Sequence, residues 1–227
     1  KEETMSIHLI KEMESLKKKL LSLGLLVSKT LHLAIQSVEK RDSELADKIE
    51  ADDDLVDQME VEIEEDCLKI LALHQPVAID LRFVITVLKI NNDLERIADL
   101  AVNIAKKGKH ITRAENFVMP IDFHGLSKIV ERMLDESIAC LVQMDINSAK
   151  NICMSDSQVD EIHKSSYELV KKAILSDPQN YDSYNNCLSI ARHMERIGDK
   201  ATNIAEDVCY MVVGKIIRHK KLDQLDN

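Results

Sequence analysis

The sequence predicts an all-α fold made of two tandem antiparallel three-helix bundles that are related by an internal repeat. Its 227 residues include only five Gly and three Pro, so helix breakers are scarce. Apolar residues recur at spacings of three and four over long stretches, which indicates amphipathic helices. The segment LERIADLAVNIA at 94–105 recurs as MERIGDKATNIA at 194–205, with eight of the twelve positions identical. Long helices joined by short loops pack as antiparallel bundles.

Three helices are expected in the first half. The apolar spacing predicts one helix over 5–40 and a second over 43–73. The sequence HQP at 74–76 ends the second helix, because Pro lacks a backbone donor and disfavours helix in the residue before it. A third helix is expected over 77–107, with Gly108 as its C-cap.

The same order of elements recurs in the second half. Helices are expected over 120–145, 146–175 and 181–218, and SDP at 176–178 separates the last two. The expected second helices of the two halves also share the motif DxxVD. Each half therefore has three helices with a Pro-containing break before the last.

The domain boundaries follow from this repeat. We expect the first bundle to span 1–108 and the second to span 119–218. Residues 109–118 lie in the longest stretch without apolar periodicity, so we interpret them as a linker.

Composition excludes several classes of protein. The formal net charge is −10 and no Lys/Arg cluster forms a basic face, so nucleic-acid binding is not expected. The five Cys are scattered without a CxxC motif, which favours buried thiols in a reducing compartment. No apolar run approaches the length of a membrane span and no signal segment is recognised. We therefore expect a cytoplasmic protein without direct membrane insertion.

Carboxylates recur in pairs at helical spacing in both halves. Residues four apart lie on one face of a helix, so Glu95 and Asp99 form a stripe beside the apolar seam. The DxxVD motif places a second pair on the preceding helix of the same half. If these two helices pack antiparallel, each bundle brings four carboxylates together. The first set is Asp53, Asp57, Glu95 and Asp99, and the second set is Asp156, Asp160, Glu195 and Asp199.

Three explanations for these carboxylates are open: metal binding, ion pairing with helix packing, and direct catalysis. Crowded carboxylates repel one another, and a cation with a preference for oxygen ligands, such as Fe, Mn, Mg, Ca or Zn, would offset that repulsion. Alternatively, Arg96 and Arg196 pair with carboxylates on neighbouring helices. Interhelical hydrogen bonding is the preferred interpretation of Asn103 and Asn203, with a supporting role beside a metal as the alternative.

His163 lies three residues after Asp160, and Glu60 takes the corresponding place in the first half. Both residues could serve as ligands, although exposed polar side chains are the more common case. The sequence has no Glu-x-x-His pair of the kind that di-iron bundle enzymes use. It also has no Gly-rich phosphate loop and no GxSxG, so an enzyme is not expected.

Two long segments resemble the signature of the PhoU family of phosphate-homeostasis regulators. The first is HQPVAIDLRFVITVLKINNDLERIADLAVNIA at 74–105, and the second is IARHMERIGDKATNIAEDVCYMVVG at 190–214. The resemblance covers nearly the whole chain and includes both DxxVD motifs. The sequence departs from the family where Ala98 replaces a frequent Gly, where Leu9 replaces an aromatic residue, and where Leu23 replaces the Met of a common Met-Gly.

The resemblance implies both an architecture and a role. It implies two three-helix bundles with iron or zinc clusters held by the two carboxylate sets, although some members have no metal. The implied role is negative regulation of phosphate uptake and of the phosphate-starvation response. The implied partners are the ATPase subunit of the phosphate ABC transporter and the phosphate sensor histidine kinase. These partners would bring the protein to the inner face of the membrane, and many members form homodimers. The alternative is a bundle-core carboxylate metalloprotein, for metal storage or as a di-metal enzyme, with no signalling role.

Overall fold

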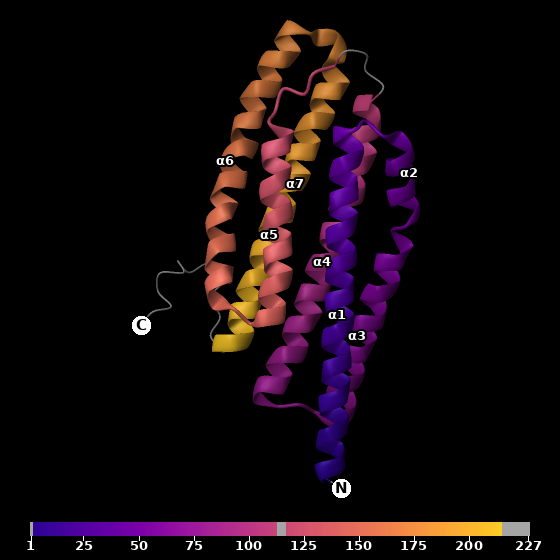
Figure 1. The fold of residues 1–227 in the computed structure, drawn as a ribbon, viewed down its shortest axis with the longest axis vertical. Coiled ribbons are helices and arrows are strands. Elements are labelled where there is room, and N and C mark those ends of the chain that lie inside the picture. The colour runs from indigo at the N-terminus through magenta and orange to yellow at the C-terminus, as the bar shows by residue number, and fades with distance from the viewer. Residues whose placement is uncertain (1, 113–116, 215–227) are drawn as a thin grey trace.

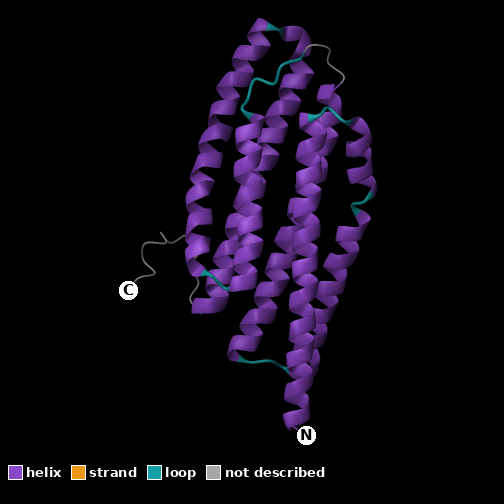
Figure 2. Ribbon diagram, in the orientation of Figure 1, coloured by secondary structure: helices purple, strands orange, loops and turns teal. Residues whose placement is uncertain are grey.

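The computed structural model describes residues 2–112 and 117–214, and these residues form long helices joined by short connections (Figures 1 and 2). The all-α fold with tandem helical bundles is therefore confirmed. The elements of the first half are α1 (Glu2–Glu39), α2 (Ser43–Ala51), α3 (Asp54–His74) and α4 (Ala78–Thr112). Those of the second half are α5 (Phe123–Gln143), α6 (Ile146–Ser176), the 3₁₀ turn η1 (Pro178–Asn180) and α7 (Tyr181–Val213).

The expected second helix of the first half is interrupted, which corrects the prediction of one helix over 43–73. It consists of α2 and α3, which are separated by a turn at Asp52 and Asp53. Three consecutive aspartates, residues of low helix propensity, lie at the break. The corresponding stretch of α6 stays helical, and its hydroxyls at Ser155 and Ser157 donate to carbonyl oxygens within the same helix.

The end of α4 also differs from the prediction. Gly108 is not a C-cap, because α4 continues through it to Thr112. A Cβ at this position would lie 2.7 Å from Cγ2 of Val38, so glycine allows α1 and α4 to approach closely. In the second half α7 ends at Val213, followed by Gly214 at a φ of 73° as its C-cap. The predicted continuation of this helix over 215–218 lies outside the described residues.

Helices of the first half pack antiparallel to helices of the second half (Figure 1). Helices α4 and α7 run side by side through the middle of the molecule, and α1 packs against α5 (Figure 1). Two ion pairs cross between α4 and α7, from Lys200 Nζ to Asp93 Oδ1 at 2.7 Å and from Lys89 Nζ to Asp207 Oδ1 at 3.4 Å. On the α1–α5 seam, Ser28 Oγ donates to Asp135 Oδ1 at 2.6 Å.

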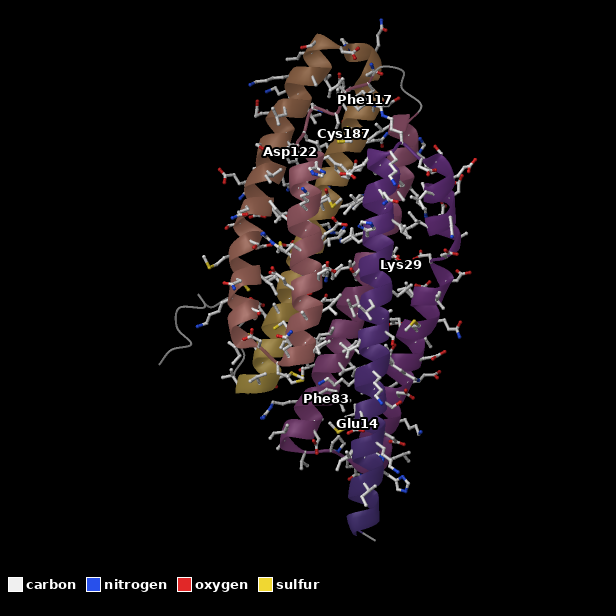
Figure 3. All side chains as sticks on the ribbon, in the orientation of Figure 1. Glu14, Lys29, Phe83, Phe117, Asp122 and Cys187 are labelled. Carbon is white, nitrogen blue, oxygen red and sulfur yellow. The ribbon has the colours of Figure 1, made fainter. Side chains whose placement is uncertain are left out.

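A single apolar core runs through both halves. Its members follow the three- and four-residue spacing that predicted the helices, and Ile97 and Ile197 have no exposed surface at corresponding positions of α4 and α7. Figure 3 shows the described side chains, with Phe117 and Cys187 labelled near the end where the first half connects to the second. The ring of Phe117 packs on Tyr184, with 5.0 Å between the ring centroids.

Helix α1 corrects the expectation that no apolar run reaches the length of a membrane span. By length and composition alone, its residues 7–39 are apolar enough to cross a membrane. The core helix of a soluble protein passes the same test, and α1 contributes fully buried Leu16, Leu23 and Leu31 to the core of this molecule. Its composition is thus accounted for by packing against α3, α4 and α5.

Candidate metal centres

The first set of carboxylates lies where the start of α3 meets the middle of α4. These helices run antiparallel (Figure 1), and Asn91 Nδ2 donates to the Glu60 carbonyl oxygen at 2.9 Å across their contact. Asp53 therefore lies near Asp99, and Asp57 lies near Glu95, close enough for their charges to interact. In the first half the structure therefore places the four predicted residues on facing helices, within range of one another's charges.

The second set occupies the equivalent place between α6 and α7. Asp156 is near Asp199, and Asp160 is near both Glu195 and Asp199. The two helices approach closely at Gly198, where an added Cβ would lie 3.6 Å from Asp156 Oδ1. Because α6 continues without a break, its two aspartates stay one helical turn apart on the face that meets α7. Both halves thus carry their carboxylates on facing helices, within range of one another's charges.

Partial burial and mutual repulsion raise the pKa of five of these carboxylates, so these five are harder to ionise. Burial, followed by the charges of Asp199 and Asp160, raises the pKa of Asp156 to about 6. Burial and then neighbouring carboxylates also raise the pKa of Asp53, Glu95 and Glu195. A divalent cation placed between such groups would favour their ionised form.

The arginine explanation receives limited support. Arg96 Nε lies 3.3 Å from Glu95 Oε2, and its Nη1 lies 3.5 Å from Asp99 Oδ2. Both partners are on its own helix, whereas the sequence alternative required a partner on a neighbouring helix. Asn103 likewise donates to the carbonyl oxygen of Asp99 one turn earlier in α4, so the prediction of an interhelical hydrogen bond was wrong for this residue.

Other charged side chains lie close to each carboxylate set, and most of them were not predicted from the sequence. In the second half Glu206 lies near Asp156, and it is on the same face of α7 as Asp199, two helical turns later. Its counterpart in the first half, one hundred residues earlier, is Lys106. Lys106 Nζ pairs with Glu50 Oε1 at 3.4 Å, and its positive charge partly offsets the rise in the pKa of Asp53. The repeat offset alone could have revealed this reversal of charge.

The donor set fits a metal ion in its chemistry, although the carboxylates of each set stand apart from one another. Within the described ranges 2–112 and 117–214, no three His, Cys, Asp or Glu side chains already meet in a metal-binding group. Such spacing is expected of like charges, because each carboxylate rotates away from its neighbours. Asp57 and Asp199 are exposed and the remaining six carboxylates are half-buried, so the side chains have room to turn.

A buried nitrogen in the second set supports this fit. Nε2 of His163 is shielded from solvent and has no hydrogen-bond partner. The imidazole lies near Asp160 and Asp199, and its ring packs on Tyr167 with 5.4 Å between centroids. An unsatisfied buried polar atom is costly unless something binds it. Its counterpart Glu60 lies near Asp57 and Glu95 in the first half, so both positions border their carboxylate sets.

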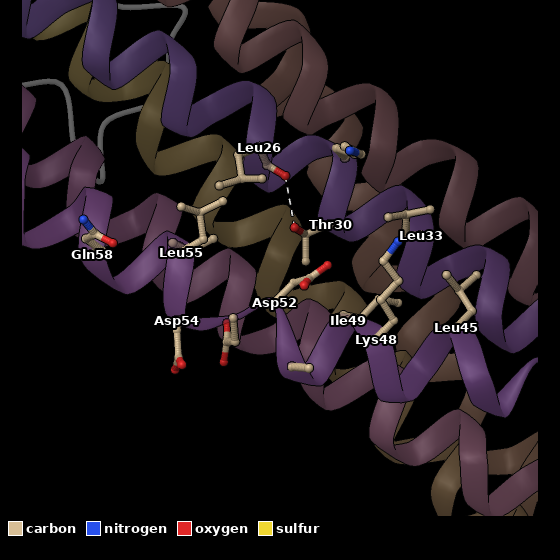
Figure 4. Close-up of a pocket in the computed structure, with 14 residues that line it drawn as sticks. Leu26, Thr30, Leu33, Leu45, Lys48, Ile49, Asp52, Asp54, Leu55 and Gln58 are labelled. Carbon is tan, nitrogen blue, oxygen red and sulfur yellow. Dashed lines mark hydrogen bonds between the residues drawn. The ribbon is translucent and has the colours of Figure 1, made fainter.

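A cavity of about 590 Å³ adjoins the first set at the α2–α3 break (Figure 4). Apolar side chains of α1 and α2, including Leu26 and Ile49, line it together with Lys29 and Lys48. Thr30 Oγ1 donates to the carbonyl oxygen of Leu26 at 3.0 Å inside this wall. Asp53 belongs to both the cavity wall and the first carboxylate set.

Fold and site together define a duplicated helical-bundle protein that carries one carboxylate-rich cluster in each half. A family model described as the PhoU domain matches the chain twice, over residues 20–108 and 123–208. The chain belongs to the PhoU family, as the sequence resemblance indicated.

Its relatives match over nearly their full length. A phosphate-specific transport system accessory protein PhoU homolog from Aquifex aeolicus is 33% identical over 95% of this chain and 98% of its own length. The crystal structure of PhoU from Pseudomonas aeruginosa superposes with a TM-score of 0.87 at 33% identity, covering 90% of this chain and 99% of that one. The phosphate transport system regulatory protein PhoU from Streptococcus pneumoniae gives 0.82 at 29% identity, covering 92% and 98%.

Proposed function

We propose that this chain is a non-enzymatic regulator of phosphate homeostasis that restrains phosphate uptake and the phosphate-starvation response. The observation that carries the proposal is the pair of carboxylate clusters, set on facing helices in both halves of a fold shared along its length with phosphate-transport accessory proteins.

The proposed partners are the ATPase subunit of the phosphate ABC transporter and the phosphate sensor histidine kinase. Relatives named accessory proteins of the phosphate-specific transport system support an association with transport components. Under this proposal the protein works in the cytoplasm, as a homodimer, and reaches the inner membrane only through these partners. It needs no basic face, in keeping with a formal net charge of −10.

In the proposed arrangement each carboxylate set holds a metal ion or cluster, with iron and zinc as the candidates. Asp53, Asp57, Glu95 and Asp99 would hold one, and Asp156, Asp160, Glu195 and Asp199 would hold the other. A bound cation would remove the repulsion between these side chains and fix the facing helices. Neutralising a set would then loosen that helix pair as well as remove its metal.

Deletion of the gene tests the regulatory role. In cells supplied with ample phosphate, loss of the protein is expected to raise alkaline phosphatase expression and polyphosphate content. Reintroduction of the wild-type gene should restore both to their starting levels. Unchanged phosphatase and polyphosphate in the deletion strain would contradict the proposal.

A pull-down separates this role from metal storage without signalling. The tagged protein, expressed at its native level, is expected to retain the transporter ATPase subunit or the sensor kinase. Retention of neither, together with an unchanged deletion strain and bound metal, would favour the storage protein. Loss of redox turnover upon changing Glu95 and Glu195 to Gln would instead favour a di-metal enzyme.

A further inference from the structure

The cavity at the α2–α3 break lies between one face of α1 and the interrupted second helix of the first half. Its α1 wall is a single stripe of residues at i, i+3, i+4 and i+7, namely Leu26, Lys29, Thr30 and Leu33. Residues of α2 and α3 line the opposite wall, and the turn at Asp52 joins them (Figure 4). Its volume of about 590 Å³ falls among those of small-molecule sites, which measure about 300–1,000 Å³.

The apolar part of this lining is aliphatic. Leu26 on α1, Ile49 on α2 and Leu55 on α3 all contribute to it, and none of the described lining residues is aromatic. Flat rings such as nucleobases stack on aromatic side chains, so this wall fits a flexible hydrocarbon chain better than a ring. Leu55 is 51% exposed, and a ligand that covered its side chain would bury apolar surface.

Two lysines from facing helices bring positive charge to the cavity. Lys29 belongs to α1 and Lys48 to α2, and both are exposed and without an ion pair to any described residue. Lys29 also lines a smaller hollow with Glu131 and Asp135, but these two carboxylates are already hydrogen-bonded across the α1–α5 seam. Two unpaired ammonium groups at one cavity favour an anionic group placed between them.

The aspartates at the break oppose the lysines only in part. Figure 4 shows Asp54 directed away from the cavity, whereas Asp52 is directed toward Thr30. Asp53 lies near Asp99 of α4, in the first carboxylate set. Asp52 is therefore the carboxylate that competes with an anionic ligand, and the two lysines outnumber it.

We propose that this cavity binds an aliphatic chain that ends in an anionic group, with the chain along the leucine and isoleucine side chains and the anion between Lys29 and Lys48. A free fatty acid and a single-chain lipid with a phosphate head group share this chemistry. The proposal depends neither on metal in the carboxylate sets nor on the regulatory role. Because Asp53 also lines the cavity, the occupant would lie beside the first carboxylate set.

Calorimetric titration of the whole chain with dodecanoate, kept below its critical micelle concentration, tests the proposal. We expect saturable binding at one site per chain. Dodecyltrimethylammonium, which has the same chain and the opposite charge, should bind roughly tenfold more weakly. Octanoate, which has a shorter chain, should also bind at least roughly tenfold more weakly. Dodecyl phosphate distinguishes the two sources, because tighter binding than dodecanoate indicates a phosphate-headed lipid and weaker binding indicates a fatty acid.

Charge substitutions at the cavity should act with opposite signs. Lys29→Gln combined with Lys48→Gln is expected to weaken dodecanoate binding roughly tenfold, because both cations are lost. Asp52→Asn is expected to strengthen it roughly twofold to fivefold, because the competing carboxylate is removed. Lys172→Gln is the matched control, since Lys172 is an exposed lysine of α6 outside the cavity.

A substitution in the aliphatic wall tests the place of the chain. Leu55→Gln is expected to weaken dodecanoate binding roughly fivefold or more. Leu68→Gln is its control, because Leu68 is 55% exposed on the same helix and is not a lining residue. Both leucines are exposed, so neither change removes a core side chain, and far-ultraviolet circular dichroism checks that the helices are intact.

Three results would overturn the proposal. The first is a lack of saturable binding of both dodecanoate and dodecyl phosphate. The second is equal affinity for the anionic and cationic head groups, or affinity that the lysine and Leu55 substitutions leave unchanged. The third is a dimer that Leu55→Gln dissociates while dodecanoate does not bind, which would assign the cavity to a second copy of the chain. The phosphatase measurement on the deletion strain tests the regulatory role separately.

Discussion

The first and second halves of the molecule place the same four carboxylates on facing helices, yet the charges around them differ. The first half has Lys106 beside Asp53, and the second has Glu206 beside Asp156. The helices that carry them differ too, because the first half breaks at Asp52 and Asp53 whereas α6 is continuous. Backbone placement was thus kept after duplication, while the electrostatics of the two clusters diverged.

The buried core is alike in the two halves, and substitutions in it are expected to have the largest effects on stability. Ile97 and Ile197 are fully buried at corresponding positions of α4 and α7. Either Ile→Ala change is expected to lower the free energy of unfolding by about 3 kcal/mol, through lost burial and a residual cavity. Urea denaturation measures both. Losses that differ by more than about 1.5 kcal/mol would show that the packing of the halves is not equivalent.

Substitutions of the carboxylates are expected to affect stability differently in the two halves. Asp156 has its pKa raised from about 3.8 to about 6, so the folded state holds a proton that the unfolded state has lost between these pH values. Stability of the metal-free protein therefore falls as pH rises through this window. Asp156→Asn removes the penalty and is expected to stabilise the protein at pH 7 by roughly 1 kcal/mol, reduced by solvent screening of a half-exposed group.

The gain from Asp156→Asn should vanish below pH 4, where the aspartate is protonated in both states. Asp53→Asn is the matched variant in the first half. Asp53→Asn is expected to stabilise the protein less, because the charge of Lys106 already offsets part of the rise in the pKa of Asp53. Thermal unfolding from pH 3.5 to pH 7.5 in the presence of a chelator measures both variants. A larger gain at Asp53 than at Asp156 would reverse the comparison.

Exchanging the charge at the divergent position should make the halves more alike. Lys106→Glu removes the pair with Glu50 and adds a negative charge beside Asp53. We expect a loss of about 0.5–1 kcal/mol at pH 7 and a further rise in the pKa of Asp53. Carboxyl ¹³C chemical shifts followed through a pH titration report that pKa directly. An Asp53 pKa that stays constant would show that Lys106 does not act on this carboxylate.

The smallest effects concern the glycines. A Cβ at Gly198 would lie no closer than 3.5 Å to its neighbours, and the corresponding residue is Ala98. Gly198→Ala is expected to stabilise α7 by about 0.5 kcal/mol through helix propensity. Gly108→Ala should be less favourable, because its Cβ would meet Val38 at 2.7 Å. Differential scanning calorimetry compares the two, and a higher melting temperature for Gly108→Ala than for Gly198→Ala would contradict this account.

Periodicity and the repeat predicted most of this architecture, and tertiary contacts determined the rest. The convergence of Asp53 with Asp99 was predictable, because helix order and four-residue spacing fix which faces meet. The continuation of α4 past Gly108 was not predictable, since it depends on the approach of Val38 from α1. The break at Asp52 was not predictable from apolar spacing, because spacing does not register the low helix propensity of three consecutive aspartates.

The surroundings of the clusters were harder to predict than the clusters themselves. Glu206 lies just after the repeated twelve-residue segment, so a comparison of identical positions does not include it. The informative signal was the opposite one, a place where the two copies differ in charge. The partial burial of His163 and the lack of a hydrogen-bond partner at its Nε2 were not predictable from the sequence, because both depend on the packing of α6 against α7.

Elemental analysis tests the central claim, that each half carries its own metal-binding carboxylate cluster, most directly. The wild-type protein, purified without chelators or affinity metal, would be compared with two variants, Glu95→Ala with Asp99→Ala and Glu195→Ala with Asp199→Ala. Stoichiometric iron or zinc in the wild type is expected, with partial loss in each folded variant. The same metal content in all three proteins would contradict the claim.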